Sequence, residues 1–168
     1  LHERHCGLGA QMSPFAGYDM PIEYEGLDEE HLAVRTKAGL FDVSHMGEVD
    51  IDGPDAVRFV NHIFTGDISE LPTGHAVYGM MTNELGGVVD DLLVYRKGAD
   101  SFMLVINAAN IDKDIEWIRR HAGAFHVEVR DRCADFGQLA LQGPDSEAVM
   151  NAALGIDGSD LGFYTFKS

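Results

Sequence analysis

The sequence has few cysteines, few basic residues and no long hydrophobic run. Its two cysteines, Cys6 and Cys133, do not form a C-x-x-C pair, so no zinc or redox motif is predicted and free thiols are expected. The 12 lysine and arginine residues are outnumbered by 28 aspartate and glutamate residues, which gives a formal net charge of −16 at pH 7. We therefore expect neither nucleic acid nor a membrane as a partner, because phosphate binding depends on cationic side chains.

Signals for membrane insertion, targeting and several common enzyme classes are also missing. No apolar stretch approaches the roughly 20 residues of a membrane-spanning helix, and no targeting segment is recognisable, so a cytoplasmic location is expected. Phosphate-loop, G-x-S-x-G and H-E-x-x-H patterns are absent. Ser44 and His45 would face apart on a strand, which argues against a nucleophile pair. The eight histidines are dispersed, and no metal site is predicted.

The residue pattern predicts a mixture of helices and antiparallel strands. Expected strands are residues 47–52, 75–82, 88–95, 101–107 and 126–129, and expected helices are 28–39, 54–65 and 110–123, with a further strand and helix between 139 and 155. Pro54 is expected at the first position of its helix, and Asn110 is expected to cap another. Residues 14–24 lack periodicity and suggest a covering loop or core filler. The order indicates an α+β fold, with mainly antiparallel sheets and helices on one face.

Residues 83–95, NELGGVVDDLLVY, place two adjacent aspartates inside an apolar run that is typical of a strand. Strand side chains alternate between faces, so Asp90 and Asp91 point in opposite directions and one of them should lie among apolar neighbours. An unpaired buried carboxylate costs roughly 2–5 kcal/mol unless it is hydrogen-bonded or paired with a ligand. Such a group is a candidate acid, base or ligand anchor. The alternative is a bulge or strand end beside Gly86 and Gly87, with both acids in water.

Five segments, in order, carry a family resemblance: FAGYDMPIEY, AVRTKAGLFDVSHMGE, NELGGVVDDLLVY, INAANIDKDIEWI and LQGPD. Together they resemble the glycine cleavage system T-protein, a tetrahydrofolate-dependent aminomethyltransferase, over nearly all 168 residues. The resemblance implies transfer of the methylene of an aminomethyl group, carried on the lipoyl arm of the H-protein, to tetrahydrofolate with release of ammonia. It makes tetrahydrofolate the co-substrate and the lipoylated H-protein the partner.

The resemblance also implies site residues. Asp91 matches the second acid of the family's G-G-x-x-D-D motif, the catalytic aspartate, and is expected in a dry pocket against the pterin. The positions that match folate-binding residues are Met46, Tyr78, Asp91, Leu93, Tyr95, Asn107 and Tyr164. Strand alternation independently puts Asp91, Leu93 and Tyr95 on one face, which suits a pterin that needs apolar walls and a few polar groups. For Met46 and Tyr78 taken alone, core packing is the simpler role.

The family fold divides the chain into parts of two domains. Residues 1–49 and 135–168 are expected to belong to a discontinuous first domain, and residues 50–134 to a ferredoxin-like second domain. The third domain of the family is expected to be absent, because family members are more than twice as long. We expect the fragment alone to bind the anionic folate poorly and to be inactive or nearly so.

Two other functions remain open from the sequence. One is a related folate-dependent demethylase, or the folate domain of a sarcosine- or dimethylglycine-oxidising enzyme, which shares the scaffold and often the acid. The other is a non-catalytic folate-binding scaffold, against which the intact GGVVDDL segment argues.

Overall fold

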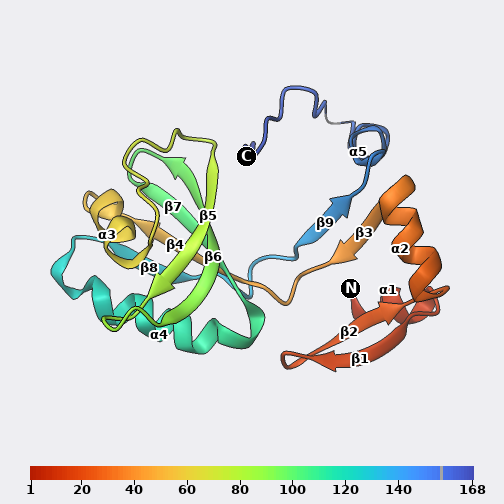
Figure 1. The fold of residues 1–168 in the computed structure, drawn as a ribbon, viewed down its shortest axis with the longest axis horizontal. Coiled ribbons are helices and arrows are strands. Elements are labelled where there is room, and N and C mark those ends of the chain that lie inside the picture. Colours follow the sequence, from red (N-terminus) through yellow and green to blue (C-terminus); the bar gives the residue numbers. More distant parts are fainter. Residues whose placement is uncertain (156) are drawn as a thin grey trace. The chain divides into compact units, whose positions relative to one another are not determined.

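The computed structural model describes residues 1–155 and 157–168, and the chain forms two compact units (Figure 1). The first unit contains Leu1–His45 and Gly137–Leu161, and the second contains Met46–Phe136 and Gly162–Ser168. Residues 46–49, 135–136 and 162–168, which the sequence analysis assigned to the first domain, therefore lie in the second unit.

The second unit is a five-stranded antiparallel sheet with two helices. Its elements are β4 (Gly47–Asp52), α3 (Ala56–Ile63), β5 (Ala76–Thr82), β6 (Val88–Gly98), β7 (Ser101–Ile106), α4 (Ile111–His121) and β8 (Glu128–Asp131). The strand order across the sheet is β5-β6-β7-β4-β8, and every neighbouring pair is antiparallel. This confirms the predicted order of strand, helix, three strands, helix and strand, and with it the α+β class.

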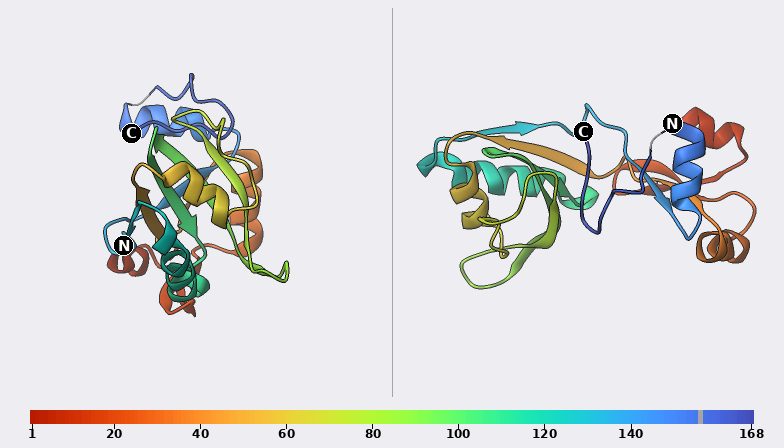
Figure 2. Two further views of the ribbon diagram at one scale, coloured as in Figure 1. Left: turned by 90° about the vertical axis from the view of Figure 1, so that its left-hand side faces the viewer. Right: turned by 90° about the horizontal axis from the view of Figure 1, so that it is seen from above.

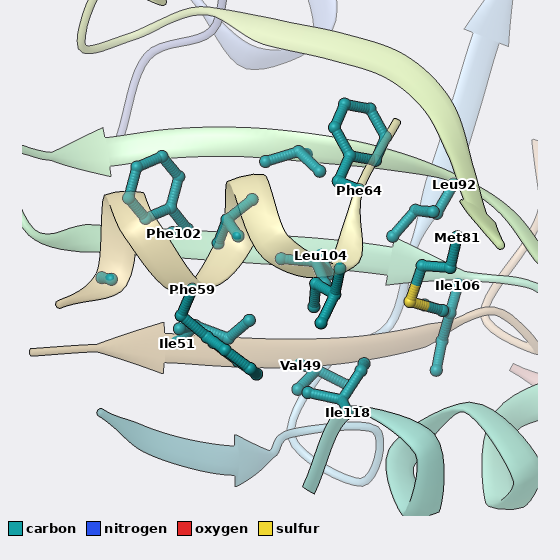
Figure 3. Close-up of a cluster of buried hydrophobic side chains, with 14 of the residues drawn as sticks. Val49, Ile51, Phe59, Phe64, Met81, Leu92, Phe102, Leu104, Ile106 and Ile118 are labelled. Carbon is teal, nitrogen blue, oxygen red and sulfur yellow. The ribbon is translucent and has the colours of Figure 1, made fainter. Parts of the chain in front are cut away.

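The core of this unit lies between one face of the sheet and the two helices (Figures 2 and 3). Alternate residues of each strand enter it, as the period of a strand requires. The labelled side chains that fill it are Val49, Ile51, Phe59, Phe64, Met81, Leu92, Phe102, Leu104, Ile106 and Ile118, all 5% exposed or less. Burial of these apolar surfaces, at about 25 cal/mol per Å², holds the helices against the sheet.

A Gly-Pro-Asp turn, residues 53–55, connects β4 to α3. The same turn contacts His126, which lies just before β8. Gly53 has a φ of +142°, and a Cβ there would lie 2.4 Å from the main-chain oxygen of His126, so only glycine fits. The Asp55 carboxylate accepts the N–H of His126 at 2.9 Å. Pro54 belongs to this turn and α3 begins at Ala56, so the prediction that proline occupies the first helical position is wrong.

The first unit is built from short elements with long-range pairing. They are α1 (His2–Gly7), β1 (Gln11–Phe15), β2 (Tyr18–Glu23), α2 (Leu27–Thr36), β3 (Gly39–Asp42), β9 (Leu139–Gln142) and α5 (Ser146–Leu154). Strand β3 pairs antiparallel with β9. The interpretation of residues 14–24 as a loop or core filler is wrong, because β1 and β2 form a hairpin. Its two turn residues, Ala16 and Gly17, both have positive φ, which is the backbone of a tight hairpin turn.

Truncation of a core aromatic tests this packing. Phe59 of α3 is fully buried, so Phe59→Ala should lower the free energy of unfolding by about 3–5 kcal/mol through lost burial and the cavity left behind. Phe163, which is 91% exposed in the same unit, provides the matched control Phe163→Ala. Urea denaturation measures both variants, and equal losses in the two would show that Phe59 does not lie in the core.

Candidate functional site

The two adjacent aspartates of β6 point to opposite faces of the sheet. Asp90 is 3% exposed and shares the core face with Leu92 and Val94, while Asp91 is exposed. The prediction that one acid is buried is confirmed. Asp90 is the buried one, because the core and α4 cover the face that carries it, while Asp91 lies on the other, exposed face and its place against a pterin stays a prediction.

Asp90 is surrounded by hydrogen-bond donors. The main-chain N–H of Asn107 donates to its Oδ2 at 3.0 Å, and the Asn107 side-chain amide donates to its Oδ1 at 3.0 Å. The Asn110 amide donates to Oδ1 at 2.6 Å. Asn110 stands at the N-cap position of α4, as predicted, but its side chain binds Asp90 and makes no capping hydrogen bond. Burial opposes ionisation of Asp90, but its neighbours, among them the hydrogen-bonded Asn107 and Asn110, outweigh burial and lower the pKa of Asp90.

A second buried acid, Asp114 of α4, lies beside Asp90. Its side chain is fully buried, and neither of its oxygens has a hydrogen-bond partner among the described residues. Burial, with the negative charge of Asp90, raises the pKa of Asp114 to about 8, which Lys113 at 3.6 Å only partly opposes. Burial therefore favours the protonated form of Asp114 at neutral pH.

On the other face of the sheet, two side chains hold the Asp91 carboxylate. The Tyr78 hydroxyl donates to Oδ2 at 2.7 Å, and the Asn107 amide donates to Oδ1 at 3.3 Å and to the Asp91 main-chain oxygen at 2.8 Å. The hydrogen bond to Asp91, together with burial and its charge, raises the pKa of Tyr78. Asn107 thus contacts both aspartates, and Asp91 presents a carboxylate with free acceptor positions to the surface.

Next to Asp91, on the same face of the sheet, lie apolar and aromatic side chains. Leu93 lies opposite Tyr78 in the β5–β6 register, and Tyr95 follows on the same side of β6. The ring of Tyr95 contacts that of Phe166 at 5.3 Å between centroids, with planes at 69°. Burial, and then the charge of Tyr164, raises the pKa of Tyr95. The face therefore combines one carboxylate with an aromatic surface.

Two more of the predicted residues adjoin this face. Tyr164 lies in the segment that ends the second unit, where its main-chain oxygen accepts the N–H of Ala76 at 2.8 Å. Its φ of +53° is a left-handed conformation that costs a non-glycine residue about 1–2 kcal/mol. Extending the Gly47–Ile106 register by one residue places Met46 opposite Asn107. All seven residues predicted to bind folate thus belong to the second unit. Four lie on β5 and β6, Asn107 follows β7, Met46 directly precedes β4, and Tyr164 lies in the segment that ends the unit.

Sequence reasoning missed two neighbours of Asp90, the half-buried Asn110 and the buried Asp114. Their spacing of i, i+4 at the start of a helix places them on one helical face, and this signal could have found them. It also missed Asp50 of β4, which is 1% exposed and paired with Lys97 at 2.5 Å and Arg132 at 2.8 Å. These two cations are therefore already engaged in ion pairs with a carboxylate.

Other sites considered from the sequence are not assembled in the part of the chain that the structure describes. No three His, Cys, Asp or Glu side chains are grouped to hold a metal ion, and no described helix is long and apolar enough to cross a membrane. Cys6 and Cys133 are free thiols. The Ser44 hydroxyl exchanges hydrogen bonds with the main chain of Gln138, while the His45 ring packs edge-on against Phe15.

The first unit contains a cavity of about 540 Å³. Apolar side chains line it together with three carboxylates, those of Glu25, Glu30 and Asp42. None of the residues predicted to bind folate lines this cavity. The chemistry of the paired aspartates therefore belongs to the second unit alone.

Comparison with known proteins identifies the family. A family model described as the GCVT N-terminal domain matches residues 1–168. The aminomethyltransferase of Desulfitobacterium hafniense (strain Y51) is 46% identical over 99% of this chain and 46% of that protein, and the aminomethyltransferase of Thermotoga neapolitana is 48% identical with the same coverage. The crystal structure of glycine cleavage system aminomethyltransferase T from Bartonella henselae superposes on this chain with a TM-score of 0.91 and 38% sequence identity. The match covers 98% of this chain and 45% of that protein.

The chain belongs to the GCVT N-terminal domain family, and its matched relatives are aminomethyltransferases. This confirms the resemblance to the glycine cleavage system T-protein and the corresponding fold. The chain spans about 46% of the length of the curated relatives that it matches.

Replacement of Asp114 tests whether this buried acid keeps its proton in the folded state. The folded state keeps this proton up to about pH 8, whereas the unfolded chain releases it near pH 4, so the contribution of this group to the free energy of unfolding falls between those values. Its slope is at most about 1.4 kcal/mol per pH unit. Asp114→Asn should flatten the pH dependence in urea denaturation, while Asp112→Asn, an exposed change in the same helix, should not. Identical pH slopes for Asp114→Asn and the unmodified chain would contradict a buried proton.

Proposed function

We propose that the whole protein moves the methylene of an aminomethyl group from a lipoyl carrier to tetrahydrofolate and releases ammonia. The observation that carries this proposal is the Asp91 carboxylate, which Tyr78 and Asn107 orient on an exposed aromatic face. Family membership supports the reaction class, because the matched relatives are aminomethyltransferases. The proposed partner is the lipoylated H-protein, and a cytoplasmic location stays a prediction.

The hydrogen bonds of Asp91 leave it able to bind a ligand. A carboxylate has about four acceptor positions, and the side chains of Tyr78 and Asn107 use one on each oxygen. The positions that remain accept N–H donors of a pterin ring. Leu93 and Tyr95, on the same side of β6, supply the apolar wall against which such a ring packs. The residues present thus fit the proposed co-substrate.

Asp91 acts on the reacting nitrogen in this proposal. In the product, two bonds from the methylene carbon to folate nitrogens replace its bonds to the departing ammonia and to the lipoyl sulfur. An ionised carboxylate beside the attacking nitrogen stabilises the positive charge that develops there and receives the proton that is released. Asn107 and Tyr78 hold the carboxylate in place, so little reorientation is needed during the reaction.

Replacing Asp91 separates catalysis from folding. Asp91→Asn preserves size and both hydrogen-bonding neighbours but removes the charge, so turnover of the whole protein should fall by about 10²- to 10⁴-fold. Asp100→Asn, an exposed change in the turn after β6, is the matched control and should keep full turnover. The assay follows ammonia release from aminomethyl-lipoyl H-protein with tetrahydrofolate. Unchanged turnover in Asp91→Asn would reject the catalytic role and favour a non-catalytic folate-binding scaffold.

We further propose that residues 1–168 alone bind tetrahydrofolate weakly. Asp91 and Tyr78 are exposed in this chain, so a ligand bound there stays largely in water. Lys97 and Arg132 form ion pairs with Asp50, so these two cations are not free to bind an anionic ligand. Calorimetric titration should show affinity at least about tenfold below that of the whole protein, a difference of about 1.4 kcal/mol. Equal affinities would contradict this proposal and leave the role of Asp91 in turnover untouched.

A further inference from the structure

The side-chain amide of Asn107 lies between the buried aspartate and the exposed one. Its Nδ2 is 3.0 Å from Oδ1 of Asp90, 2.8 Å from the main-chain oxygen of Asp91 and 3.3 Å from Oδ1 of Asp91. Carboxylate and carbonyl oxygens accept hydrogen bonds and cannot donate them, so the amide turns its nitrogen toward them and its oxygen away. The acceptors around Asn107 therefore decide which end of its amide faces Asp91.

Hydrogen-bond donors reach both oxygens of Asp90 and fix its position. The main-chain N–H of Asn107 donates to Oδ2 at 3.0 Å, and the side-chain amides of Asn107 and Asn110 donate to Oδ1 at 3.0 and 2.6 Å. Asp90 is 3% exposed, so these donors take the place of water around it. The Asn110 bond also ties Asp90 to the start of α4, because this side chain makes no capping hydrogen bond. Asp90 thus anchors Asn107 at two points from the buried side of the sheet.

We propose that Asp90 is a positioning residue for Asp91 and acts by deciding which end of the Asn107 amide faces it. With an acceptor at position 90, the amide donates to one oxygen of Asp91 while Tyr78 donates to the other. Without that acceptor the amide can turn over and present its own oxygen to the Asp91 carboxylate, which repels it. The consequence for turnover rests on the proposed function, whereas the link from Asp90 to the Asn107 amide does not.

Replacing Asp90 by asparagine changes its hydrogen bonding and keeps its size. The new NH₂ group would oppose the side-chain amides of Asn107 and Asn110 if it stood at Oδ1, and the main-chain N–H of Asn107 if it stood at Oδ2. Either arrangement leaves donors facing donors, so Asn107 loses at least one of its two anchors. Asp112→Asn makes the same chemical change at an exposed position of α4 and is the matched control.

Hydrogen exchange of ¹⁵N-labelled asparagine side chains in the whole protein, followed by nuclear magnetic resonance, tests the link directly. The Nδ2 hydrogens of Asn107 should exchange at least about tenfold more slowly than those of Asn83, a turn residue whose side-chain oxygen accepts main-chain N–H groups. In Asp90→Asn the exchange of Asn107 should approach that of Asn83, and in Asp112→Asn it should stay slow. Equal exchange of Asn107 and Asn83 in the unmodified protein would overturn the proposal, and that comparison needs no folded variant.

Kinetics of the whole protein test the consequence for turnover. In Asp90→Asn, kcat should fall at least about tenfold while the KM for tetrahydrofolate changes less than about threefold, because the orientation of Asp91 is lost and the apolar wall of Leu93 and Tyr95 is kept. Asp112→Asn should keep kcat and KM. A folded Asp90→Asn variant with unchanged kcat, whether or not its KM rises, would contradict positioning. An unmodified protein without transferase activity would instead reject the proposed function, and hydrogen exchange would still decide the link.

Discussion

The structure of the site depends on one buried charge, the carboxylate of Asp90. An ionised carboxylate inside a protein is tolerated only when hydrogen bonds replace its water. Asp90 obtains them from Asn107, which follows β7, and from Asn110 at the start of α4. The same bonds therefore join the sheet to α4 and fix the amide that reaches Asp91.

Strand geometry gives the two neighbouring aspartates different chemistry. Because successive side chains leave a strand on opposite faces, Asp90 becomes a structural anchor and Asp91 remains available at the surface. The Asn107 amide donates to both carboxylates, so this one side chain links the buried acid to the exposed acid. Of the two adjacent acids, Asp90 is the one whose charge is buried, and Asp91 is the one available to a ligand.

Local sequence rules predicted the second unit well and only part of the first. The helix expected at 28–39 and the strand and helix expected between 139 and 155 are confirmed as α2, β9 and α5, whereas β3 and the β1–β2 hairpin were missed. Between residues 47 and 131 the elements follow from alternation, helical periodicity and glycine-rich turns, all of which are local signals. In the first unit, β3 pairs with β9 across about one hundred residues, and the β1–β2 hairpin turns at Ala16, which carries no turn signal of its own. Such pairings are decided by tertiary contacts, which local patterns do not contain.

The sequence likewise predicted some residues of the site and missed others. Alternation predicted that one aspartate is buried, but which one depends on the face that α4 covers, and that is a tertiary choice. Family resemblance supplied Asp91, Tyr78 and Asn107, and the structure joins them by hydrogen bonds. Asp114 was missed because an acid near a helix start is usually a solvated partner of the helix dipole.

A crystal structure of the whole protein with bound tetrahydrofolate tests the central claim most directly. The account predicts a pterin nitrogen within hydrogen-bonding distance of the Asp91 carboxylate, with Tyr78 and Asn107 still donating to it and Asp90 buried behind the sheet. A pterin bound to Asp90, or bound away from this face of β6 altogether, would contradict it.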